Sequence, residues 1–166
     1  MPIVSAYEND PTSDGRQSEM ATEVRNGVQN GMKHHDLVFI PEFTLPNGRR
    51  ADLIGMDSKG KIVIIEIKSS IEDFKVDEKW PEYKEFCDLF YFASHSNVPV
   101  EIFPEHEGFI LADRYGCELI RQSDENKLSA ATRKALTIRF ARTAAQRMNI
   151  FANYQGVENV NVPLNE

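Results

Sequence analysis

The stretch KIVIIEIKSS, residues 61–70, places two charged residues, Glu66 and Lys68, inside a run of isoleucine and valine. A run this apolar is typical of a strand that is covered on both faces of a sheet. An unpaired charge in such a strand costs roughly several kcal/mol. We therefore expect Glu66 and Lys68 to have specific partners, either a bound ion or opposite charges.

The residues before this stretch predict a hairpin that brings a second carboxylate to Glu66. The Ser-Lys-Gly sequence at 58–60 suits a tight turn with glycine in the left-handed position. In the resulting register, Asp52 lies directly opposite Glu66. Side chains alternate along a strand, so Asp52, Glu66 and Lys68 all project from the same face of the sheet.

Two carboxylates facing each other across a pair of strands repel unless a cation or a proton lies between them. Oxygen ligands from two strands suit Mg²⁺ or Mn²⁺, and we expect Asp52 and Glu66 to be the metal ligands. Lys68 would then orient or deprotonate a water, or neutralise charge that develops on a phosphoryl group. This pattern predicts phosphodiester hydrolysis. The alternative is a closed ion network of the three side chains without a metal.

Hydrophobic periodicity divides the remaining chain into helices and strands. Apolar residues at every fourth position predict a helix from Ser18 to about His34. A second periodic segment predicts a helix from about Ala130 to Met148, with Leu136, Phe140, Ala144 and Met148 as its apolar stripe. A short helix is expected at 79–87, and strands are expected at 37–43, 50–56, 62–68, 88–94, 108–113 and 117–121. These elements predict an α/β domain with a central mixed β-sheet flanked by α-helices.

The length of 166 residues and the hydrophobic content of 41% favour one domain. We expect this domain at residues 18–150, between a flexible N-terminal tail (1–17) and a C-terminal tail (151–166). No segment matches a secretion signal or a membrane span, which predicts a cytoplasmic protein without membrane contact. The two cysteines, Cys87 and Cys117, are too few for a disulfide framework.

The net charge of −7 argues against a protein that coats nucleic acid without specificity. Residues 127–157 differ, because they contain six basic residues and no Asp or Glu. Arg139 and Arg142 in this segment are candidates for DNA phosphate contacts. Equally, such a helix can pair with the acidic surface of its own domain.

The spacing of the candidate residues also resembles the PD-(D/E)xK nuclease superfamily. Asp52 is followed by thirteen residues and then by Glu66-Ile67-Lys68, and Ala51 stands where the family motif has proline. The resemblance implies a restriction-endonuclease-like core with Asp52, Glu66 and Lys68 as catalytic residues. It also implies a carboxylate from the preceding helix, for which Glu23 is favoured over Glu19.

A closer resemblance, over roughly residues 20–148, is to the MmcB-like DNA repair proteins of alphaproteobacteria. The stretches GRRADLIG, IVIIEIKSSIEDFKVDEKWPEYKEFCDLFYFA, GFILADRYG and RFARTAAQR carry it. Such proteins are assigned to the PD-(D/E)xK fold and are linked to DNA-damage responses. The resemblance therefore implies a DNA repair role.

Several residues after the 62–68 strand could line a groove for DNA: Ser69, Ser70, Lys79, Trp80 and Tyr83. Lys79 and Tyr83 also resemble a variant of the QxxxY motif found in some branches of the superfamily. Trp80 and Tyr83 are alternatively core residues, because aromatic side chains at helical spacing usually pack inward. Asp73 and Asp77 are expected to be helix-start and surface carboxylates.

Three hypotheses for function follow from these residues. The favoured one is a Mg²⁺- or Mn²⁺-dependent DNA nuclease that acts in repair on branched or single-stranded DNA. The second is a noncatalytic module that binds DNA or a repair partner in the same cleft. The third is a homodimer that cuts four-way junctions.

Overall fold

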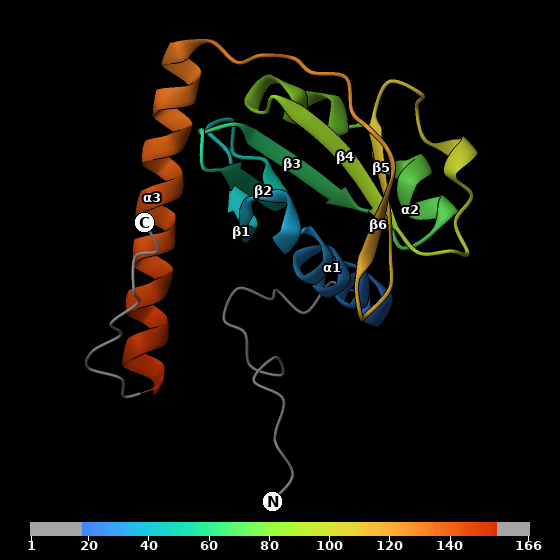
Figure 1. Cartoon of the computed structure of the whole chain (residues 1–166), viewed down its shortest axis with the longest axis horizontal. Helices are drawn as coiled ribbons and strands as arrows, with labels where there is room; N and C mark the ends of the chain where they lie inside the picture. Colours follow the sequence, from blue (N-terminus) through green and yellow to red (C-terminus); the bar gives the residue numbers. More distant parts are fainter. Residues whose placement is uncertain (1–17, 156–166) are drawn as a thin grey trace, which may run out of the picture.

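The computed structural model describes residues 18–155, which form a mixed sheet with helices on both faces (Figure 1). The six strands of the sheet are hydrogen-bonded in chain order. They are β1 (Leu37–Thr44), β2 (Arg50–Asp57), β3 (Ile62–Ile67), β4 (Leu89–Ser94), β5 (Gly108–Ala112) and β6 (Cys117–Arg121). The predicted α/β class with a central mixed sheet is confirmed.

Strands β1, β2 and β3 form the predicted antiparallel meander. At the turn between β2 and β3, Gly60 has a φ of +81°, and the Asp57 N–H donates to the Lys61 carbonyl over 3.1 Å. Ile54 pairs with Ile64 and Met56 pairs with Ile62, so the predicted register is confirmed. A shift of one residue would have moved Glu66 to the opposite face.

Strands β3, β4 and β5 run parallel, and β6 returns antiparallel to β5 as the predicted last hairpin. The β3–β4 connection contains α2 (Ile71–Val76) and the 3₁₀ helix η2 (Trp80–Phe86). The bounds of helix α2 were not predicted, but Asp73 lies in its first turn as expected of a helix-start carboxylate, and Ser70 caps the helix by accepting the Asp73 N–H over 3.0 Å. The helix expected at 79–87 is confirmed in position but winds as 3₁₀. A further 3₁₀ helix, η3 (Val100–Ile102), lies between β4 and β5.

The two faces of the sheet carry separate apolar clusters. Helix α1 (Glu19–Gly31) begins at Ser18, whose hydroxyl accepts the Ala21 N–H over 3.1 Å, and ends in the 3₁₀ helix η1 (Met32–His35). Val24 and Val28 of α1 pack against the odd-numbered residues of β3. The even-numbered residues of β3 pack against α2, η2 and the C-terminal helix. Glu66 belongs to this second face.

The C-terminal helix α3 (Ala130–Gln155) stands beside the β1 edge of the sheet (Figure 1). It is longer than predicted, because it continues past Met148 into the segment expected to be a tail. Its predicted apolar stripe is correct only in the first half. Leu136 is fully buried and the Phe140 ring lies 6.3 Å from Phe43, whereas Ala144 and Met148 are exposed.

Asp88, just before β4, ties α3 to the sheet. Arg133 of α3 donates two hydrogen bonds to its carboxylate, over 2.6 and 2.7 Å. The backbone N–H groups of Ile62 and Leu128 donate to the same carboxylate over 2.8 and 3.0 Å. Burial raises the pKa of Asp88, but these donors outweigh burial and lower the pKa to about 2.

Within residues 18–155, none of the helices is long and apolar enough to cross a bilayer.

We predict that Asp88→Asn lowers the free energy of unfolding by about 2–4 kcal/mol at pH 7, because it breaks a buried, multiply bonded ion pair. The folded-state pKa of Asp88, about 2, lies below its ordinary value of 3.8. The advantage of the wild type is therefore complete above about pH 4 and disappears as the pH falls toward 2. Urea denaturation across this range measures it. Glu125→Gln, at an exposed ion pair with Lys61, is the matched control and should change stability little.

Candidate functional site

Asp52 and Glu66 lie where the ladder between β2 and β3 ends. The last ladder pair is Leu53 with Ile65. Beyond it the side chains replace the backbone contacts: Glu66 Oε1 accepts the Asp52 N–H over 3.1 Å, and Asp52 Oδ2 accepts the Ile67 N–H over 2.8 Å. The second oxygen of each carboxylate accepts no hydrogen bond within the described chain. The structure thus brings the two predicted metal ligands together, each with one oxygen available.

The environment of this pair disfavours two negative charges. The Glu66 side chain is almost fully buried, and Asp52 is half-buried. Burial raises the pKa of Asp52 to about 6. Burial, reinforced by the negative charge of Asp52, also raises the pKa of Glu66 well above its usual value. At neutral pH, a bound cation would relieve both effects.

Lys68 lies on the same side of the sheet but bonds to a different carboxylate. Its Nζ donates to Asp77 Oδ2 over 2.6 Å. Asp77, expected to be a surface carboxylate, is mostly buried, so that expectation is wrong. Within residues 18–155, no Lys or Arg nitrogen comes within 4.0 Å of the carboxylates of Asp52 or Glu66. The closed three-residue ion network is therefore not formed.

The donor set and charge balance fit a hard divalent cation. Three further carboxylates, Glu42, Asp73 and Asp77, lie close enough to influence the pKa of Asp52 or Glu66. In the described part of the chain, no group of three His, Cys, Asp or Glu side chains is arranged as a metal cage. Mg²⁺ does not need one, because it typically takes one or two carboxylates and keeps several waters. Asp52 and Glu66 would hold it.

Glu42 of β1 is a site residue that the sequence prediction missed. Its backbone is left-handed, with a φ of +50°, and it sits in register with Asp52 at the one position where the β1–β2 ladder skips a pair. A left-handed conformation at a residue with a side chain costs roughly 1–3 kcal/mol. Its buried carboxylate is 2.7 Å from Arg50 Nε. The available signal was a glutamate in the apolar strand LVFIPEF, the same signal that identified Glu66.

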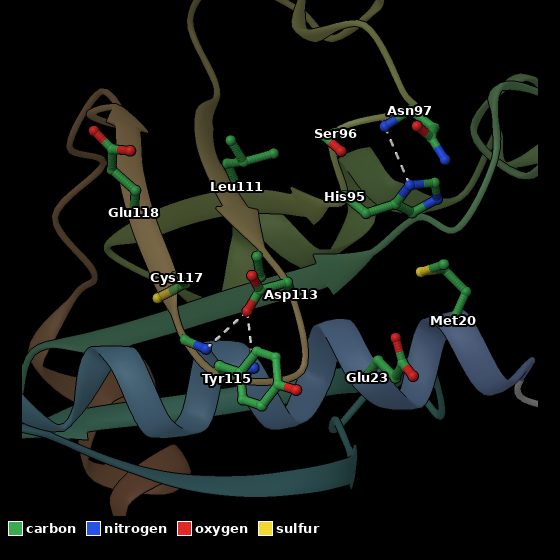
Figure 2. A pocket seen from close by; sticks show the side chains of 12 residues that line it. Met20, Glu23, His95, Ser96, Asn97, Leu111, Asp113, Tyr115, Cys117 and Glu118 are labelled. Atoms are coloured by element: carbon green, nitrogen blue, oxygen red, sulfur yellow. Dashed lines mark hydrogen bonds between the residues drawn. The ribbon is translucent and has the colours of Figure 1, made fainter.

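Glu23 lies apart from the carboxylate pair, on the α1 side of the sheet. It lines a cavity of about 590 Å³ together with Met20, His95, Asn97 and residues of the β5–β6 turn (Figure 2). The cavity adjoins the segment after Lys68, because His95 Nε2 is 2.8 Å from the Ser69 carbonyl oxygen. Between the two candidates, Glu23 lines the cavity and Glu19 is exposed. Its catalytic role stays a prediction.

The residues proposed to contact DNA after β3 have structural partners. Asp73 accepts the Ser69 N–H over 3.0 Å, and Ser70 caps α2. The Trp80 ring packs on Phe90 and Phe92, with centroids at 5.7 and 5.3 Å. Tyr83 is buried, and its hydroxyl donates to the Arg50 carbonyl over 3.2 Å. These contacts show what positions each residue, and their contacts with DNA stay a prediction.

The three predicted basic contacts lie on the surface. Lys79 and Arg142 are exposed. Arg139 is exposed too, and its guanidinium donates to the Thr44 carbonyl over 3.2 Å. Arg147, which the prediction did not name, donates to the Pro41 and Glu42 carbonyls from the same helix. Part of the basic character of α3 therefore serves to hold the helix against the β1 edge.

We predict that Asp52→Asn raises the melting temperature of the metal-free protein at pH 8. Asparagine can still accept the Ile67 N–H but carries no charge beside Glu66. The folded-state pKa of Asp52, about 6, lies above its ordinary value of 3.8. The cost of ionisation is thus absent below about pH 4 and complete above about pH 6, so the gain should disappear at pH 4.

Thermal unfolding followed by circular dichroism at both pH values measures this gain, with Glu101→Gln at an exposed position as the control. A variant that is no more stable than the wild type at pH 8 would show that the pair is already neutralised.

Comparisons with known proteins identify relatives of this chain. Residues 8–155 match the family described as DNA repair protein MmcB-like. A solved structure, the SPO1766 protein of unknown function from Silicibacter pomeroyi, is 34% identical and superposes with a TM-score of 0.78, covering 89% of this chain and 99% of its own. No curated protein matches the chain. With nearly its whole described length matched, the chain belongs to the MmcB-like DNA repair protein family.

Proposed function

We propose that this protein is a DNA repair nuclease that hydrolyses phosphodiester bonds with Mg²⁺ or Mn²⁺ held by Asp52 and Glu66. One observation carries the proposal: two adjacent carboxylates are largely withdrawn from water, and among residues 18–155 each keeps one oxygen available and has no Lys or Arg side chain in contact. Such an arrangement destabilises the fold, and its presence therefore indicates a functional reason to keep it. Membership of a DNA repair family supports DNA as the substrate.

The chain's own residues have distinct roles in this proposal. Asp52 and Glu66 are fixed by the two backbone N–H groups, so their available oxygens are preorganised. A bound metal would supply an activated water and stabilise charge on the phosphoryl oxygens. Lys68, held by Asp77, would orient the attacking water or neutralise developing charge. Glu23 would complete the site from the α1 side, directly or through a water.

A second function, noncatalytic binding of DNA or a repair partner, is favoured by the Lys68–Asp77 pair. The Lys68 ammonium lies 2.6 Å from Asp77 and is almost fully buried, so its charge is already neutralised. Lysine in this state contributes little to a phosphoryl transition state. Hydrolysis in the first proposal therefore requires Lys68 to exchange partners when DNA binds.

We assign the sheet and its flanking helices to the restriction-endonuclease-like PD-(D/E)xK fold, and the protein to the cytoplasm, where the DNA is. Branched or single-stranded DNA is the proposed substrate, with Lys79, Arg139 and Arg142 as phosphate contacts. A homodimer, which light scattering would detect, would place two such sites on one four-way junction.

We predict that the purified protein cleaves at least one of single-stranded, duplex, flapped and four-way DNA in the presence of Mn²⁺. Asp52→Asn and Glu66→Gln should each lower the rate at least about a hundredfold, the scale of losing one charge-stabilising group. Denaturing gel electrophoresis of end-labelled DNA measures the rates. Glu82→Gln, which removes a half-exposed carboxylate paired with Arg49, is the control and should cleave normally.

Persistent DNA binding without product, equal in the wild type and in Asp52→Asn, would support the binding module instead. Cleavage that survives Asp52→Asn would point to another site.

We also predict that Mn²⁺ raises the melting temperature of the wild type more at pH 8 than at pH 5. Protons and metal compete for Asp52, whose pKa is about 6 in the folded protein. Differential scanning fluorimetry at a fixed Mn²⁺ concentration tests this, and Asp52→Asn should lose most of the shift at pH 8. A shift of equal size at both pH values would place the ion elsewhere.

A further inference from the structure

We infer that the cavity lined by Glu23 (the Glu23 cavity) binds an unpaired base of single-stranded DNA, with Tyr115 stacking on the base and Asn97 bonding to its edge. This role rests on the proposed function, because it takes DNA as the ligand of the protein. It adds the class of DNA, since a base that stays paired and stacked in a duplex cannot enter a cavity.

The Glu23 cavity lies at the carboxyl ends of the parallel strands, beside the end of β3. Its walls are the start of α1, the segment after β4 and the β5–β6 turn (Figure 2). The Lys68 N–H donates to the Ala93 carbonyl over 2.9 Å, and Ser94 Oγ donates to the Lys68 carbonyl over 2.6 Å. His95 Nε2 continues this series at the Ser69 carbonyl, over 2.8 Å. Because open α/β sheets commonly bind ligands at these strand ends, DNA held near β3 can place a base here.

The charge of the Glu23 cavity favours a base over a phosphate. None of its described lining residues is Lys or Arg, whereas Glu23, Asp113 and Glu118 are acidic. Carboxylates repel phosphate but accept hydrogen bonds from the amino groups of bases. Arg114 is exposed, and its guanidinium carbon lies 5.2 Å from the centre of the Tyr115 ring. It is therefore placed to contact the phosphate of a nucleotide whose base stacks on Tyr115.

Two side chains of the cavity, Tyr115 and Asn97, are available to a ligand. Tyr115 is 77% exposed, and its backbone is held because Asp113 Oδ1 accepts the Tyr115 N–H over 2.8 Å. The Asn97 backbone N–H donates to His95 Nδ1 over 3.2 Å, but the Asn97 side-chain amide has no hydrogen-bond partner within residues 18–155. An aromatic ring stacks on any base, and an amide offers both a donor and an acceptor to a base edge.

The size of the cavity also fits. Its volume of about 590 Å³ falls within the range of roughly 300–1,000 Å³ that is typical of small-ligand sites.

Fluorescence anisotropy with labelled DNA in EDTA, where metal-dependent cleavage is blocked, tests this role. We expect the wild type to bind single-stranded DNA more tightly than the duplex of the same sequence. Tyr115→Ala should weaken single-strand binding about tenfold, the scale of one lost base stack. Asn97→Ala should weaken it about fivefold, the scale of one lost hydrogen bond. Neither variant should change duplex binding.

Tyr154→Ala is the matched control, since Tyr154 is 72% exposed on α3 and does not line the cavity. It should bind single strands like the wild type. The inference is overturned if the wild type does not bind single strands or if Tyr115→Ala binds them unchanged. The acidic cavity would then suit a basic peptide better than DNA.

Photochemical crosslinking locates the bound base. Single-stranded DNA containing 5-iodouracil is irradiated with the wild type, and mass spectrometry identifies the modified residue. We expect the crosslink at Tyr115. Crosslinks only at residues outside the Glu23 cavity would contradict the inference.

These readouts separate the inference from the nuclease proposal. If the protein cleaves no DNA in Mn²⁺ but Tyr115→Ala loses single-strand affinity, the inference holds and the nuclease proposal fails. If the wild type cleaves DNA and Tyr115→Ala binds and cleaves equally well, the inference fails and the nuclease proposal stands.

Discussion

The structure around the candidate site depends on one exchange of hydrogen bonds, in which two carboxylates accept the backbone N–H groups that the β2–β3 ladder leaves unpaired. Glu66 bonds to Asp52 N–H, and Asp52 bonds to Ile67 N–H. The exchange lets the strands separate without orphaned N–H groups, which buried backbone rarely tolerates. It also fixes two negative charges side by side in a place largely hidden from water. The same two residues therefore satisfy the backbone N–H groups and are the proposed ligands of the cation.

The remaining charges are arranged so that neither basic neighbour neutralises the pair. Lys68 forms an ion pair with Asp77, and Arg50 forms one with Glu42. Each of these pairings places a carboxylate near the site, which increases its attraction for a divalent cation. Helix α3 contributes from a distance: Arg133 ties it to Asp88, and Arg147 holds the backbone of Glu42. Two basic residues of the C-terminal helix thus bond to groups of the sheet on either side of the candidate site.

Local patterns in the sequence were enough to predict the meander, its register and the convergence of Asp52, Glu66 and Lys68. They could do so because a short glycine turn fixes register, and register fixes which side chains share a face. The partners of Lys68 and Arg50 depend on tertiary packing, so Asp77 was misjudged and Glu42 was missed. The length of α3 was underestimated because its last turns are exposed and do not follow the buried stripe.

We propose the Asp52–Glu66 pair as a site for a divalent cation. Crystals of the wild-type protein soaked in Mn²⁺ and measured near the manganese absorption edge would show whether the cation binds there. We predict an anomalous difference peak within bonding distance of one oxygen from each carboxylate. An empty site, with Lys68 turned from Asp77 to bridge Asp52 and Glu66, would contradict it.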